Sequence, residues 1–205
     1  VGKSTNRPIN KKPNNNETEK ESLIKELDCS MGIAAIGRFI GKIEEGELSV
    51  VCLYELSMER TDKTGFHAAW ILEKLCEKTP DYAELFIEEL VGNFTKIQNQ
   101  SSMRTYAKLL SRLLRQQKRG ILHETLSAML LSINPDKLIE ACFSFIINPN
   151  VRISVKQMCC ELLLFYKEKE GWIKDELHEF SAQLALQSTP AAQSYRRKLI
   201  QALEV

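Results

Sequence analysis

The sequence is poor in the residues that interrupt helices and build tight turns. Glycine occurs 9 times and proline 6 times in 205 residues, and no stretch shows a sustained alternation of apolar and polar side chains. A β-rich fold needs many turns and shows that alternation in its strands. The scarcity therefore argues against a sheet. No apolar run is long enough to cross a bilayer, so we expect no membrane partner.

An excess of charge of one sign is also missing. The 28 basic and 27 acidic residues leave a formal net charge of +1. The charge of the whole molecule thus gives no electrostatic argument for a nucleic-acid or membrane binder, although it does not exclude a local charged patch. With 43% hydrophobic and 27% charged residues, the composition is that of an ordinary water-soluble domain.

The spacings that mark metal or catalytic sites are lacking. His67, His123 and His178 are far apart, and no cysteine pair has zinc-ligand spacing. Carboxylate pairs such as Glu73 and Glu77 are interpreted as solvated helix faces rather than acid–base pairs. We predict no catalytic residue, no metal and no cofactor. Reduced core thiols are expected at Cys29, Cys52, Cys76, Cys142, Cys159 and Cys160.

The first part of the chain differs from the rest. Residues 1–22 are Asn, Lys, Pro, Glu and Thr with almost nothing apolar, which predicts a disordered tail. The segment has no apolar core of the kind found in secretory signals, so a cytoplasmic location is expected. Residues 23–205 keep one pattern throughout and are predicted to form a single domain.

That pattern is helical. Apolar residues recur at intervals of three and four, and capping residues precede prolines as at helix starts. These pairs are Thr79-Pro80, Asn134-Pro135, Asn148-Pro149 and Thr189-Pro190, while Gly120 and Gly171 mark breaks. The predicted helices cover residues 31–44, 47–58, 65–78, 80–94, 102–117, 120–132, 135–147, 150–168, 172–187 and 190–203. The predicted fold class is all-α.

Several helices open with a polar or small residue, an apolar residue and then a basic one or histidine. The stretch NPNVRISVKQMCCELLLF, residues 148–165, resembles the junction and second helix of a HEAT repeat, and SSMRTYAKLLSRLL from Ser101 resembles it more weakly. At repeat level the resemblance covers residues 47 to 205. It implies a HEAT- or armadillo-like solenoid, that is, a right-handed α–α superhelix of stacked antiparallel helix pairs. In such proteins the second helices line the concave side and hold proteins, and sometimes nucleic acids.

One cluster of charge stands out. At 100° per residue, five basic residues in and just after the predicted helix over 102–117 fall within an arc of about 80°, opposite its leucines and without an interleaved acid. They are Arg104, Lys108, Arg112, Arg115 and Arg119. Three interpretations stay open: a basic face that is solvated or paired with glutamates of a neighbouring helix, a grip for an acidic protein segment, or a contact to phosphates.

The sequence thus predicts a non-catalytic scaffold that offers a solenoid surface to a protein partner. The alternative is a nucleic-acid binder related to the HEAT-like alkylpurine DNA glycosylases. That family combines a tryptophan with an aspartate one helical turn later. Here Trp70 is followed by Lys74 and Trp172 by Glu176, so both positions depart from the pattern. Both tryptophans are predicted to be core or shoulder residues.

Overall fold

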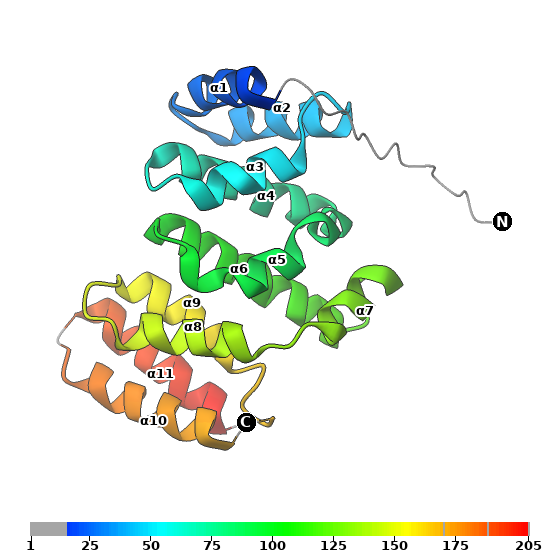
Figure 1. The fold of residues 1–205 in the computed structure, drawn as a ribbon. Coiled ribbons are helices and arrows are strands. Elements are labelled where there is room, and N and C mark those ends of the chain that lie inside the picture. Colours follow the sequence, from blue (N-terminus) through cyan, green and yellow to red (C-terminus); the bar gives the residue numbers. More distant parts are fainter. Residues whose placement is uncertain (1–15, 170, 188, 205) are drawn as a thin grey trace.

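A computed structural model describes residues 16–169, 171–187 and 189–204, and within these ranges every regular element is a helix. Figure 1 shows the helices stacked as pairs from one end of the molecule to the other. They are α1 (Asn16–Leu27), α2 (Ile33–Glu44), α3 (Val50–Glu59), α4 (Lys63–Lys78), η1 (Pro80–Leu85), α5 (Ile87–Gly92), η2 (Phe94–Lys96), α6 (Gln100–Lys118), α7 (Glu124–Ser132), α8 (Asp136–Ile147), α9 (Ile153–Leu163), α10 (Gly171–Ala185) and α11 (Pro190–Glu204).

Two rows of helices make up the stack. The first helices are α1, α3, the η1–α5 segment, α8 and α10, and the second helices are α2, α4, α6, α9 and α11 (Figure 1). Each second helix contacts the next one, so that α6 lies between α4 and α9. We call this row the second-helix ridge. Helix α7 is an extra element beside η1 and α5. The architecture confirms the predicted all-α stack of helix pairs.

Burial explains why the pairs stack. The apolar stripe of α6 is buried, with Leu109 and Leu113 fully covered, and Leu72 and Leu75 of α4 are equally covered. A single helix pair cannot hide such a stripe, whereas neighbouring pairs do so for one another. The buried side chains accordingly form one continuous core from the first pair to the last.

Polar side chains fix the register between consecutive pairs. Asp62 caps α4, and Asn99 caps α6 while its amide donates to the carbonyl of Asp62 at 2.8 Å. The next residue, Gln100, donates to the carbonyl of Asn150 at 3.0 Å and accepts from the backbone N–H of Arg152 at 2.8 Å. These hydrogen bonds connect the turns that precede α4, α6 and α9. The N-termini of these three helices therefore lie side by side, and the helices run parallel in the same direction.

The start of the domain needs a correction. Helix α1 begins at Asn16, so residues 16–22 of the predicted tail are helical, and residues 1–15 lie outside the described residues. Leu23 and Leu27 are buried, and Nδ1 of His67 donates to the carbonyl of Leu27 at 2.7 Å. These two leucines attach an otherwise polar segment to the stack.

Another correction concerns the predicted helix over residues 80–94, which is broken into η1, α5 and η2. The break falls at Phe86, whose backbone leaves the helical region with φ −148°. Its ring is buried and stacks on Tyr54 with centroids 5.4 Å apart. Core packing of this ring therefore overrides the local helical pattern.

The predicted helix over 150–168 is also shorter in the structure, where α9 begins at Ile153 and ends at Leu163. Asn148 accepts a hydrogen bond from the backbone N–H of Asn150 at 2.9 Å. The Asn-Pro pair at this place thus closes a turn before the helix instead of capping its first residue.

Candidate functional site

Helix α6 is the longest helix of the described part of the chain, and its two ends are well fixed. Asn99 accepts from the backbone N–H groups of Ser101 and Ser102 at the start. At the end Gly120 has φ +67°, and the N–H of Ile121 binds the carbonyl of Gln116 at 3.0 Å. This left-handed turn confirms the predicted break at Gly120. We call the five basic residues predicted on one face the basic stripe: Arg104, Lys108, Arg112, Arg115 and Arg119. The stripe is therefore carried by a helix whose two ends are fixed by hydrogen bonds.

The centre of the stripe is neutralised by α4. Lys108 Nζ and Arg112 Nη2 contact the same oxygen of Glu73 at 3.2 and 3.0 Å. Arg112 also reaches Glu77 at 3.0 Å, and Lys74 pairs with Glu77 as well. The side chain of Glu73 is only 2% exposed, so the sequence-based interpretation of this acid as solvated was wrong. A buried carboxylate held by two cations from the next helix acts as a clamp between α4 and α6.

The protonation of this cluster follows from its contacts. The hydrogen bond from Lys74, followed by the charge of Arg112, lowers the pKa of Glu77 below its ordinary range. The same bond raises the pKa of Lys74. Both groups are thus charged at neutral pH. Lys108 and Arg112 at the centre of the stripe have acidic ion-pair partners within the molecule.

The ends of the stripe differ from its centre. Arg104, Arg115 and Arg119 are exposed, and none of them forms an ion pair with a residue that the structure describes. Arg104 and Arg115 lie on the same face of α6, about 16 Å apart along the axis at 1.5 Å per residue. The interpretations that the sequence left open therefore apply to different residues. Lys108 and Arg112 pair with glutamates of the neighbouring helix, whereas Arg104, Arg115 and Arg119 are available to bind a partner.

Two aromatic rings of α4 lie on the same ridge. Phe66 and Trp70 are both partly buried and stack with centroids 5.7 Å apart and an interplanar angle of 12°. The contact between Lys108 and Glu73 sets the register, which places Trp70 level with the turn from Arg104 to Lys108. The shoulder position predicted for Trp70 fits its partial burial, and this register puts the ring at the height of the turn that begins with the first free arginine.

Charge is distributed unevenly between the two rows of helices. Every first helix, with the η1–α5 segment taken as one, carries more acids than bases. No second helix does so, and α6 has several bases and no acid at all. The small net charge of the chain thus hides two rows of opposite character, and the second-helix ridge is the basic one.

Most of the thiols are buried in the core, and the histidines occupy different positions. His123 caps α7 by accepting from the N–H of Thr125 at 3.4 Å, and His178 is exposed. Cys142 and Cys159 are fully buried, and burial raises the pKa of the Cys76 thiol to about 12. The core position expected for Cys29 was wrong, because this thiol is exposed, and Cys52 is half-buried. In the described ranges no three metal-binding side chains gather at one place. None of the helices described there is long and apolar enough to cross a membrane.

The comparisons with known proteins agree with the geometry. A family model described as HEAT repeat domain matches residues 23–203, which is nearly the whole stack. No match was found among curated proteins or among solved structures. Because the match covers far more than half of the chain and the helices stack as repeat pairs, the protein belongs to the HEAT repeat family.

Proposed function

We propose that the protein is a non-catalytic interaction module whose α6 surface binds an acidic segment of a protein partner. The supporting observation is that Arg104, Arg115 and Arg119 are exposed without an ion pair to a described residue, while their neighbours are fixed by Glu73 and Glu77. The helix fixes the backbone positions of these arginines before binding, so that no backbone ordering of this segment is needed when a partner docks. Guanidinium groups bind carboxylates with two parallel hydrogen bonds.

The spacing of the free arginines indicates what the partner looks like. Arg104 and Arg115 are about 16 Å apart along the helix, which corresponds to about five residues of an extended chain. We expect acidic residues at about this separation, with an apolar side chain near the first one. Phe66 and Trp70 provide the complementary surface for that apolar group. HEAT repeat proteins generally mediate protein interactions, which is in keeping with this use of the ridge.

The test is charge reversal at the exposed ends of the stripe. The full chain with Arg104→Glu and Arg115→Glu is compared with the wild type in affinity purification, and its affinity for the recovered partner is then measured. We expect a loss of at least about tenfold, since two attractive contacts become repulsive. Arg197→Glu with Lys198→Glu, at exposed positions of α11, is the matched control and leaves binding unchanged. Equal binding by both double variants would reject the α6 surface.

A second candidate is the phosphate backbone of a nucleic acid, since α6 and its C-cap carry five bases on one face and α6 contains no acid. If all three free arginines contact phosphates, the logarithm of the affinity for duplex DNA falls with the logarithm of the salt concentration with a slope of about −2.7. A gel-shift titration at several salt concentrations measures that slope. Release of a damaged base would support the relation to the glycosylases. Absence of binding at low salt leaves the protein partner as the proposal.

A further inference from the structure

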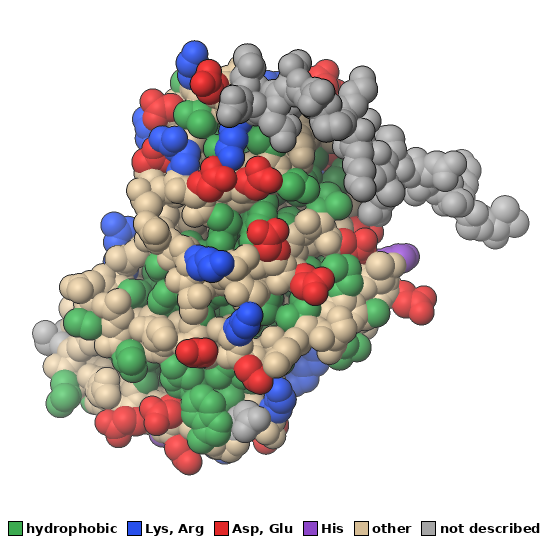
Figure 2. Space-filling model, viewed as in Figure 1, with side chains coloured by type: hydrophobic (Ala, Val, Ile, Leu, Met, Phe, Trp, Pro, Cys, Tyr) green, Lys and Arg blue, Asp and Glu red, His purple; other side chains and the backbone are tan. Residues whose placement is uncertain are grey.

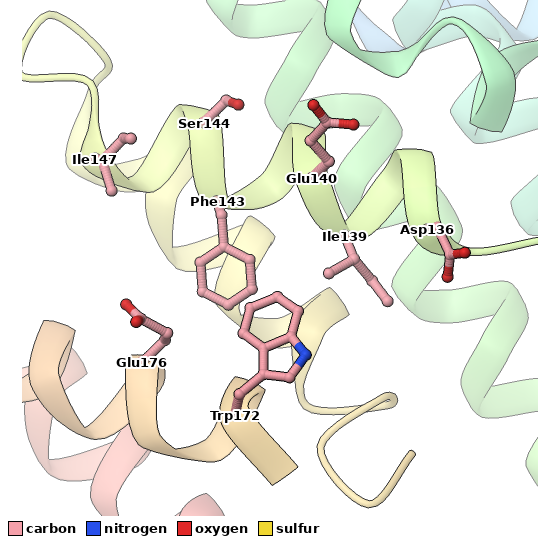
Figure 3. A pocket seen from close by; sticks show the side chains of 8 residues that line it. All are labelled: Asp136, Ile139, Glu140, Phe143, Ser144, Ile147, Trp172 and Glu176. Atoms are coloured by element: carbon pink, nitrogen blue, oxygen red, sulfur yellow. The ribbon is translucent and has the colours of Figure 1, made fainter. Parts of the chain in front are cut away.

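A second surface lies on the row of first helices, away from the stripe. Between α8 and α10 the structure has an open groove of about 600 Å³. Figure 2 shows hydrophobic side chains exposed there with acidic ones on either side, and Figure 3 shows the groove from close by. The groove is lined by Asp136, Ile139, Glu140, Phe143, Trp172 and Glu176, together with Ser144 and Ile147.

The floor of the groove is aromatic. Trp172 lies against Phe143 with ring centroids 5.1 Å apart and an interplanar angle of 37°, and Ile139 lies beside them (Figure 3). Trp172 is nevertheless 49% exposed, and Ile147 at the far end of α8 is 76% exposed. Of the two positions predicted for Trp172, core or shoulder, the structure thus shows the half-exposed shoulder position. A tryptophan left half in water beside other exposed apolar groups is typical of a docking site.

The walls of the groove are acidic. Figure 3 shows Glu176 on α10 on the same side as the ring pair, and Glu140 rising from the opposite side of α8. Neither has a cation within ion-pair distance among the described residues, while Asp136 has one exposed contact to Lys169 at 3.6 Å. Glu176 beside the indole ring and Glu140 across α8 both lack an ion-pair partner among the described residues, and together they give this surface a negative potential. A guanidinium or ammonium group over the ring would gain from both the carboxylates and the π-electrons.

We propose that this groove binds a cationic segment of a partner protein, in which lysine or arginine residues flank an aliphatic side chain. The aliphatic group covers the Phe143–Trp172 pair, one basic group lies beside Glu176, and another reaches Glu140 across α8. Charge complementarity selects this occupant, because an acidic or neutral segment leaves the two carboxylates uncompensated. The inference does not depend on the function proposed for α6, since the two surfaces lie on different rows of helices and favour partners of opposite charge.

The test uses the full chain and a fluorescein-labelled peptide of lysine, arginine and leucine, with fluorescence anisotropy as the readout. A peptide in which the basic residues are replaced by glutamate and aspartate serves as the negative probe. We expect saturable binding of the basic peptide only. Trp172→Ala, and separately Glu140→Gln with Glu176→Gln, each weaken it by about tenfold, which is the size of one lost cation–π or charge contact in a partly desolvated site.

A matched control removes the same charge from α10 outside the groove. Asp175→Asn with Glu179→Gln changes two exposed acids that do not line the groove, and we expect the affinity to stay within twofold of the wild type. If this control weakens binding as much as Glu140→Gln with Glu176→Gln, the peptide senses only net charge and the proposal is wrong. Equal binding of the acidic peptide would also overturn it.

Two further outcomes separate the alternatives. Sedimentation of the wild type and of Trp172→Ala shows whether a second copy occupies the groove. If the wild type self-associates and Trp172→Ala does not, a second copy of this chain occupies the groove, and the proposed partner segment is wrong. The variant with Arg104→Glu and Arg115→Glu is expected to bind the basic peptide with unchanged affinity. A negative result for the α6 surface therefore does not affect the proposal for this groove, and a negative result for the groove does not affect the proposal for α6.

Discussion

The centre and the ends of the α6 stripe are built from the same residue types on the same face of one helix, yet they are in different states. Lys108 and Arg112 meet a carboxylate that is almost completely buried, whereas Arg104 and Arg115 point to solvent without an ion pair to a described residue. The difference comes from α4, whose acid at position 73 faces only the central turns. A basic stripe is thus divided by its neighbour into a structural part and a part available for binding.

The largest expected effect comes from breaking the structural part. Arg112→Ala leaves Glu73 buried with the weaker contacts to Lys108 and Lys74. We expect a loss of about 2 kcal/mol in the free energy of unfolding, below the usual cost of breaking a buried pair because two cations remain. Arg115→Ala on the same helix is expected to change it by less than about 0.5 kcal/mol.

Urea denaturation followed by circular dichroism measures both variants under the same conditions. Equal losses for the two arginines would show that the division between centre and ends is wrong. If both variants instead retain full stability, the contact to Glu73 contributes no net free energy of folding. The centre and the ends of the stripe would then differ only in the exposure of their side chains.

A smaller effect is expected where the stripe ends. Gly120 has φ +67°, a backbone region that costs a residue with a β-carbon about 1 kcal/mol. Nothing lies within 4 Å of the added methyl group, so Gly120→Ala isolates the backbone term. We expect a stability loss of about 1 kcal/mol. Faster hydrogen exchange is expected in the last turn of α6, which holds Arg115, and not around Arg112.

Uniformly faster hydrogen exchange along the whole of α6 in Gly120→Ala would contradict the division of the stripe into a centre and ends. It would mean that the centre and the C-terminal end of α6 unfold together. Gly92→Ala is a suitable control, because Gly92 ends α5 without a positive φ and also has nothing within 4 Å. It is expected to leave exchange in α6 unchanged.

Much of this site could be predicted because it is local. The arc of basic residues and the glycine that ends the helix follow from spacing along one helix. The burial of Glu73 was missed, although a signal was present: at 100° per residue it lies only 40° from Ala69, which is buried on the core edge of α4. Pairing of Arg112 with this acid depends on the register between α4 and α6, which one sequence read helix by helix does not contain.

Two of the three wrong boundaries have the same kind of cause. Phe86 leaves the helix because its ring packs on Tyr54, a residue far away in the sequence. Helix α1 is attached through Leu23 and Leu27, which are too few to make a polar segment look helical by periodicity. The α8–α10 groove was missed for a related reason. Whether Trp172 is covered depends on how two helices from different pairs are spaced.

The smallest expected effect concerns Glu77, the second carboxylate that pairs with Arg112 at the centre of the stripe. The pKa of Glu77 is lowered, first by the hydrogen bond from Lys74 and then by the charge of Arg112. A carboxyl group whose pKa is lower in the folded than in the unfolded state stabilises the fold above its unfolded value, about 4.3. That contribution is lost as the pH falls through the folded value. Wild-type stability should therefore decline more steeply below about pH 4.5 than that of Glu77→Gln.

Because the Glu77 side chain is 42% exposed, solvent screening limits the difference to a few tenths of a kcal/mol. Urea denaturation at pH 6 and at pH 3 in both proteins measures it, and Glu88→Gln, an exposed acid of α5, is the control with the wild-type slope. If the central cations act as one cluster, Arg112→Ala should also flatten the decline, whereas Arg115→Ala should not. Equal flattening by both arginine variants would mean that the whole stripe acts on Glu77 through its general field, and the boundary between a fixed centre and free ends would disappear.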